Sequence, residues 1–164
     1  MSEKSFENLV SEHGRQVLNT ALRVLGDVNL ANDVHQEVFL AIWKRWPRYN
    51  GHTNWPAYLY RATVRKALQT ARRQNGYQRA APPQREDTNQ RPESDLRADE
   101  LRQKLAVALA GLPKRQADVF ILRRLEGLET TEVARLLGCS HQTVSVHLHR
   151  ALRKLSRSLS AYLG

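Results

Sequence analysis

Hydrophobic side chains recur every three or four residues in the first part of the chain, which is the spacing of amphipathic helices. Residues 5–25 carry this pattern and end at Gly26. The same spacing continues from Asn29 to Trp46, after which Pro47 cannot extend a helix. Two helices are therefore predicted, and the second turns the following apolar side chains towards the first: Leu30, Val34, Val38, Ala41 and Ile42.

A third helix is predicted after the polar loop 48–54, because Asn54 is a good N-cap and Pro56 suits a first helical turn. The helical pattern fades between residues 74 and 98, where three prolines and one leucine stand among polar residues. Such a stretch buries too little apolar surface to order itself. We predict a flexible linker there.

Helical spacing resumes at Leu101, is interrupted by Gly111 and Pro113, and continues to Gly127. No segment alternates apolar and polar residues as a strand does, and the chain contains no internal repeat. The pattern predicts an all-α protein of two small helical domains joined by a flexible linker, with residues 1–75, 76–98 and 99–164 as domain, linker and domain.

The strongest local motif is a helix-turn-helix. Thr130 can cap a short helix, Gly138 suits the left-handed conformation that ends it, and Ser140 can cap the next helix. Ala134 lets the two helices cross closely, and Val144 faces inward. The second helix can enter the major groove of DNA, with His141, Gln142, Ser145, Val146 and His149 towards base edges and Arg150, Arg153 and Arg157 towards phosphates.

The charge of the chain indicates which class of partner it binds. The 164 residues include 26 Lys and Arg against 16 Asp and Glu, and the formal net charge of +10 favours a polyanionic partner. Two segments lack acidic residues altogether: residues 41–73 carry eight basic side chains and residues 133–164 carry five. The first segment also holds all three tryptophans and three of the five tyrosines. Cations that track a backbone and rings that stack on bases suit single-stranded nucleic acid.

Composition and missing motifs argue against several other classes. The single cysteine, Cys139, allows no disulfide framework, and its place in the turn of the helix-turn-helix favours a structural role over zinc binding. No apolar signal core or membrane span is present, so we predict a soluble, cytoplasmic protein. No glycine-rich phosphate loop, HExxH pair or nucleophile elbow is present, so we expect no catalysis, metal or cofactor.

Motifs in both predicted domains point to one family. Residues 32–43, NDVHQEVFLAIW, are followed at 58–61 by YLYR; beyond the linker come LPKRQ at 112–116, the helix-turn-helix, and LHRA at 148–151. In this order, the motifs resemble region two and region four of the extracytoplasmic-function (ECF) sigma factors of bacterial RNA polymerase.

The resemblance implies a mechanism. It implies that Asp33, Gln36, Glu37 and Leu40 dock on the clamp of the largest subunit of core RNA polymerase. The basic, aromatic segment would hold the promoter's minus-ten element as its strands separate, and the second domain would read the minus-thirty-five element and touch the polymerase flap. Two lobes on a loose linker would also permit an anti-sigma factor to wedge between them.

The expected DNA contacts fall into two sets. Those for the minus-ten element are Arg48, Tyr49, Asn50, His52, Asn54, Trp55, Tyr58, Arg61 and Arg65. Those for the minus-thirty-five element are Arg115, His141, Gln142, Thr143, Ser145, Val146, His149, Arg150 and Arg153.

The chain departs from the family pattern at two places. Arg65 stands where the family commonly has Asn in the melting helix, and Ser145-Val146-His147 stands where the recognition helix often reads Lys-Ser-Arg. With fewer cations at the front of the recognition helix, we expect a shallower salt dependence of DNA binding by the second domain.

Two other functions stay open from the residues alone. Residues 138–147 also resemble the recognition helix of LuxR-type regulators, which would act without polymerase docking. Such a chain usually carries an α/β receiver or ligand-binding domain, and no such pattern is present. An RNA-binding or anti-termination protein of two helical bundles is compatible with the Trp, Tyr and Arg side chains of residues 41–73.

Overall fold

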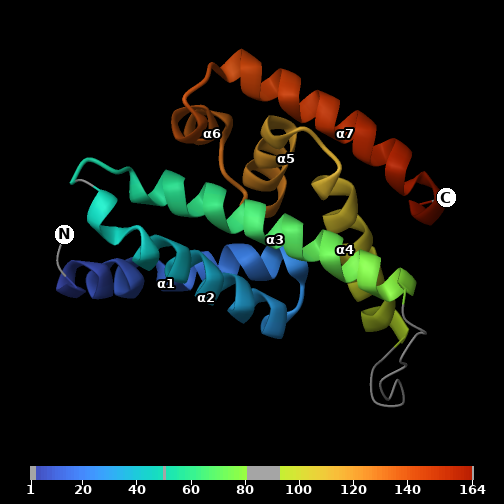
Figure 1. Cartoon of the computed structure of the whole chain (residues 1–164). Coiled ribbons are helices and arrows are strands. Elements are labelled where there is room, and N and C mark those ends of the chain that lie inside the picture. The colour runs from blue at the N-terminus through green and yellow to red at the C-terminus, as the bar shows by residue number, and fades with distance from the viewer. Residues whose placement is uncertain (1–2, 50, 81–92, 164) are drawn as a thin grey trace.

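The computed structural model describes residues 3–49, 51–80 and 93–163, and every regular element in these ranges is a helix, which confirms the all-α prediction. The N-terminal bundle consists of three helices that pack against one another: α1 (Glu3–Leu25), α2 (Val28–Lys44) and α3 (Trp55–Ala80) (Figure 1). A 3-10 turn at Trp46–Arg48 lies between α2 and α3. The bundle forms because each helix carries an apolar stripe that packing removes from water.

Local chemistry sets both ends of α2. Gly26 adopts the left-handed conformation (φ +69°) that ends α1, and the side chain of Asp27 then caps α2 by accepting the N–H of Leu30 at 3.0 Å. At the other end Arg45 leaves the helical conformation (φ −107°, ψ 10°). The helix stops two residues before its predicted end at Trp46, and Trp46 begins the 3-10 turn instead.

The buried stripe of α2 differs from the prediction at one turn. Val34, Val38 and Ile42 are buried as predicted, but Ala41 is exposed and Phe39 is buried in its place. The helix is rotated so that the bulkier ring enters the core, since a phenylalanine removes far more apolar surface from water than an alanine does.

The C-terminal bundle contains the predicted break at Gly111 and Pro113, which separates its first two helices. Its elements are α4 (Glu93–Ala110), α5 (Lys114–Phe120), the π-turn η3 (Ile121–Leu125), α6 (Thr130–Leu137) and α7 (His141–Leu163). The long α7 packs across α4, α5 and α6 and so holds this bundle together.

Helical structure extends into both ends of the predicted linker 76–98. Helix α3 continues to Ala80 and α4 begins at Glu93. Arg, Gln and Ala are good helix formers, so the ends of these helices continue without an apolar stripe. Residues 81–92 lie outside the described residues.

The two bundles are in contact along α3. Figure 1 shows α3 in the middle of the molecule, with α1 and α2 on one side and α5, α6 and α7 on the other, while α4 crosses α3 near its C-terminal end. Helix α4 packs against both α3 and α1, and the buried apolar side chains of the two bundles join into one core cluster. We call this contact between the bundles the seam. The sequence alone predicts two lobes on a loose linker, whereas here the lobes lie side by side.

None of the helices in the described ranges has both the length and the apolar character needed to cross a membrane.

Candidate polymerase and nucleic-acid interfaces

Four exposed side chains of α2 form a surface that we call the docking face: Asp33, Gln36, Glu37 and Leu40. Their offsets of three, four and seven residues place them on the side of α2 that turns away from the core. Leu40 is 51% exposed, so an apolar side chain stands in solvent beside two carboxylates and an amide. Oxygen Oε2 of Glu37 lies 3.5 Å from Nζ of Lys66 on α3, which balances part of its charge within the protein.

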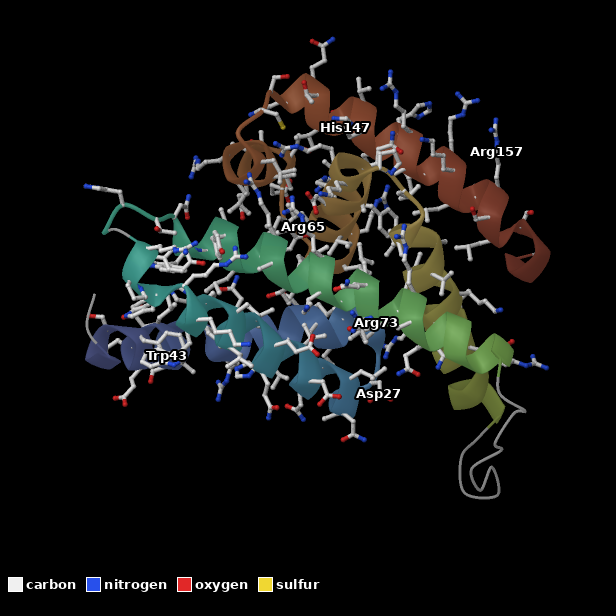
Figure 2. The ribbon with its side chains drawn as sticks, in the orientation of Figure 1. Asp27, Trp43, Arg65, Arg73, His147 and Arg157 are labelled. Carbon is white, nitrogen blue, oxygen red and sulfur yellow. The ribbon has the colours of Figure 1, made fainter. Side chains whose placement is uncertain are left out.

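Trp43 extends the docking face, and sequence reasoning left it out of the predicted polymerase contacts. Its ring is 42% exposed and packs 4.9 Å from the ring of Phe6 on α1 (Figure 2). The sequence contains the spacing that places Trp43 on this face. Trp43 follows Leu40 by three residues and Gln36 by seven, which are the offsets of one helix face.

Rings predicted to stack on DNA bases stack mainly on one another. Trp46 is buried and stacks on Trp55, with ring centres 5.8 Å apart and ring planes inclined by 28°. Tyr49 packs on Trp55 at 5.1 Å, and the hydroxyls of Tyr49 and Tyr58 are 2.6 Å apart. This cluster ties the loop before α3 to its first turns. Tyr58 keeps 36% of its surface exposed and is the most exposed ring of the cluster.

The cluster changes the acidity of one phenol. Burial raises the pKa of Tyr49 to about 12, and the hydrogen bond and charge of Tyr58 act in the same direction, against a smaller opposite effect of Arg45. Tyr49 is therefore neutral at physiological pH and acts as a packing and hydrogen-bonding group.

The other predicted minus-ten residues of the loop lie at the surface. Arg48, His52 and Asn54 are exposed. The side chain of Asn54 accepts the N–H of Ala57 at 3.4 Å, which confirms its prediction as the N-cap of α3. Asn50 lies outside the described residues.

Two predicted minus-ten cations on α3 face the C-terminal bundle. Arg61 is half-buried and donates to the carbonyl oxygen of Leu136 in α6 at 3.4 Å. Arg65 is exposed; it lies on the side of α3 that turns towards the C-terminal helices (Figure 2), within electrostatic reach of Asp118 on α5. Burial raises the pKa of the Asp118 carboxyl, while Arg65 and neighbouring cations oppose that rise.

The helix-turn-helix forms as the sequence predicts. Gly138 adopts the left-handed conformation (φ +66°) at the end of α6. Ser140 caps α7, because its Oγ accepts the N–H of Thr143 at 3.1 Å and lies 2.8 Å from the Thr143 hydroxyl. Val144 is fully buried between the helices. The turn and the start of α7 are therefore held by both hydrogen bonds and packing.

One detail of the motif differs from the prediction. Thr130 is the first residue of α6 rather than its cap. Glu129 takes the N-cap position, since its backbone is already extended (φ −71°, ψ 155°), and its side chain makes no capping hydrogen bond.

The outer side of α7 forms a second surface, which we call the reading face. Its exposed side chains are His141, Gln142, Ser145, Val146, His149, Arg150 and Arg153. Arg157 continues this side of α7 away from the N-terminal bundle (Figure 2). Two predicted contacts have internal roles: Thr143 is half-buried at the cap, and Arg115 donates to the carbonyl oxygen of Leu137 at 3.0 Å, bracing the end of α6.

His147 lies on the inner side of α7. It is half-buried, its Nδ1 is buried without a hydrogen-bond partner among the described residues, and burial lowers its pKa, with Arg150 and Arg115 acting in the same direction. Cys139 is half-buried in the turn before α7. Over the described ranges, no three His, Cys, Asp or Glu side chains gather in a metal-binding arrangement.

Comparison with known proteins identifies the family of the chain. Residues 9–77 match Sigma-70 region 2 and residues 102–155 match Sigma-70, region 4. The ECF RNA polymerase sigma factor SigE of Mycolicibacterium smegmatis is 29% identical over 164 residues, an alignment that covers 96% of this chain and 63% of that protein. The RNA polymerase sigma-E factor of Streptomyces coelicolor is 31% identical over 162 residues, covering 95% of this chain and 86% of that protein. This chain belongs to the ECF-type sigma factors.

A solved sigma factor has the same fold. RpoE of Bartonella quintana, in complex with the anti-sigma factor NepR, superposes on this sigma factor with a TM-score of 0.53 at 17% identity, covering 96% of this chain and 98% of RpoE. Family membership also argues against a LuxR-type regulator, because the residues before the helix-turn-helix match Sigma-70 region 2.

Proposed function

We propose that this sigma factor binds core RNA polymerase through the docking face and holds promoter DNA at two places, with α3 and the loop before it at the minus-ten element and with the reading face at the minus-thirty-five element. The docking face carries the proposal: an exposed leucine, Leu40, stands among acidic and amide groups on a helix whose other side is buried. Protein contacts commonly centre on such an apolar residue within a polar rim.

The two DNA surfaces suit different states of DNA. The reading face is a continuous helix side with polar groups at its N-terminal end and arginines further along, as required to read a major groove and clamp phosphates. The minus-ten surface adds the exposed ring of Tyr58 to the cations of α3, which suits an unpaired strand. A protein that binds unpaired bases favours strand opening by mass action.

The proposed protein partners follow from the separation of the docking face from the DNA-binding surfaces. The clamp of the largest polymerase subunit would receive the docking face, and the flap would meet the C-terminal bundle. An anti-sigma factor is also proposed as a partner, because the similarly folded RpoE is bound to one.

A polymerase pull-down tests the docking face. Asp33→Ala combined with Gln36→Ala is expected to weaken co-elution with purified core polymerase by at least about tenfold, since groups at the centre of an interface carry most of its affinity. Glu12→Ala with Gln16→Ala is the matched control, because it removes an acid and an amide from the exposed surface of α1. Run-off transcription on genomic fragments should follow the same order, and equal co-elution of both double variants would contradict the assignment.

A further inference from the structure

Helix α7 carries an exposed valine in the middle of the reading face. Val146 is 41% exposed, although Val144, two residues earlier on the same helix, is completely buried. The other side chains of the reading face are polar or basic, so Val146 supplies its aliphatic surface. Methyl groups that stay in water add little to the stability of the bundle, and they remain available for contact with a ligand.

The buried side of α7 fixes the direction in which Val146 points. Val144, Ala151, Leu155 and Leu159 are buried along one side of the helix. Each residue of an α-helix is turned by about 100° from the one before, so Val146 lies about 200° from Val144 and nearly opposite the buried side. The outer side of α7 faces away from the seam (Figures 1 and 2). Val146 therefore lies on the line of α7 that is furthest from the core.

Hydrogen bonds and packing hold the start of α7 in place. Gly138 ends α6 in the left-handed conformation, and the Oγ of Ser140 accepts the N–H of Thr143 at 3.1 Å. The side chain of a valine in a helix also has one strongly preferred rotamer. A ligand that meets the methyl groups of Val146 thus has to order neither the backbone nor the side chain, which keeps the entropic cost of the contact low.

The chemistry of the reading face changes along α7. Residues 141–149 contain no lysine or arginine, and Arg150 and Arg153 are the first cations of the helix. Arginines at these later positions suit phosphate oxygens, whereas the N-terminal part of a recognition helix lies against base edges. Val146 belongs to the uncharged part, so we expect it to meet a base rather than the backbone of the DNA.

Thymine is the base whose edge fits an aliphatic side chain. In the major groove it presents a methyl group at C5, which apolar side chains recognise by direct contact. Guanine and adenine present hydrogen-bonding groups at their edges. Val146 has no group that could pair with them, and covering them with methyl groups would remove water without replacing its hydrogen bonds.

We propose that Val146 selects thymine at one position of the minus-thirty-five element by packing its methyl groups against the C5 methyl group of the base. This inference rests on the proposed function of the reading face and adds the base that the middle of this face prefers. The contact makes Val146 a specificity-determining residue, whereas Arg150 and Arg153 add affinity for any sequence.

Replacement of thymine by uracil tests the contact directly, because the two bases differ only in this methyl group. The full chain bound to core polymerase first selects binding sites from a pool of random duplex DNA, and each thymine of the selected sites is then replaced singly. At one thymine of the upstream element, uracil is expected to weaken binding about three- to fivefold, as for the loss of one buried methyl group.

Substitutions at position 146 link this effect to the valine. Val146→Ala should abolish the difference between thymine and uracil at that position, because the shortened side chain no longer reaches the base. Val146→Thr keeps one of the two methyl groups and should retain part of the difference.

Leu152→Ala is the matched control. Leu152 is a second apolar side chain of α7 with 36% exposure, but it lies about 120° round the helix from Val146, so the full uracil effect should persist. Thymines of the minus-ten element give an internal control, since their response to uracil should be equal in all variants. Thermal melting checks that each variant is folded.

Two results would overturn the contact. One is a uracil effect that persists undiminished in Val146→Ala, and the other is a selected upstream element in which no thymine responds to uracil. Either result, obtained with a chain that binds core polymerase, contradicts this inference alone. Failure of the unaltered chain to bind core polymerase would instead contradict the proposed function.

Discussion

Helices α3 and α7 are both basic, but they differ in how far the rest of the protein covers them. Both belong to segments without acidic residues, and both are proposed to bind DNA. Helix α7 lies at the edge of the molecule and turns its outer side to solvent, whereas α3 lies in the middle with its cations against carbonyl oxygens (Figures 1 and 2). The comparison teaches that charge marks a surface able to bind phosphate, and that its place in the fold decides whether it is available.

The largest effect is expected where α7 meets the core. Val144→Asp puts a carboxylate where the side chain is fully buried and should destabilise the C-terminal bundle by more than about 3 kcal/mol. Val146→Asp, two residues on and 41% exposed, should change stability by less than about 0.5 kcal/mol. Thermal melting compares the two variants, and similar melting temperatures would show that the two sides of α7 are not as distinct as described.

Arginines of the two helices should respond differently to polymerase. In the free chain, Arg153→Ala should weaken binding to duplex DNA about tenfold at low salt, because a charged phosphate contact is lost, and should reduce the salt slope by about 1. Arg61→Ala, which removes a guanidinium group already bound to the carbonyl oxygen of Leu136, should have little effect on DNA binding by the free chain and should impair strand opening in the polymerase complex. Fluorescence anisotropy and permanganate footprinting measure these effects. Equal losses for both variants in the free chain would remove the contrast between α3 and α7.

A smaller effect is expected at the cap of α7. Ser140→Ala removes the acceptor for the N–H of Thr143 and should cost about 1 kcal/mol of stability. Ser156→Ala, at an exposed position further along α7, is the control and should be nearly neutral. Urea unfolding measures both, and a neutral Ser140→Ala would mean that packing alone holds the start of the reading face.

The smallest effect is a pH dependence on the inner side of α7. Burial lowers the pKa of His147 in the folded state, so the unfolded chain takes up a proton first. Stability should therefore fall as the pH drops through the ordinary histidine range near 6.5 towards the lowered value. His147→Leu should flatten this part of the stability curve. A curve identical to that of the unaltered chain would assign the dependence to another group.

Local elements were predictable because they depend on neighbours in sequence. The left-handed Gly138, the Ser140 cap and the Asn54 cap each involve groups a few residues apart, and all three are present. Thr130 was misassigned as a cap because a neighbouring residue can take the same backbone conformation. Ala41 was wrongly placed in the apolar stripe and Phe39 was left out of it, because periodicity locates a stripe but leaves its rotation about the helix axis uncertain by one position.

The sequence predicts which residue types belong to the proposed sites. It predicts less well which of these side chains lie together at the surface. The docking face needs only helical offsets, which the sequence contains. The aromatic cluster depends on packing between the loop and α3, so composition alone leaves open whether a ring faces DNA or another ring.

From the amino-acid order alone came the helices, the caps at Asn54 and Ser140, the helix-turn-helix and the acid-free segments, because hydrogen bonds and periodic burial within a helix act over a few residues. Tertiary structure alone decided that Arg61 and Arg72 bind carbonyl oxygens of α6 and α4, and that Arg23 meets Glu126. These partners are separated by 38 to 103 positions in the chain. They meet only when the bundles pack, so the local sequence around each charged residue does not show which group it will contact.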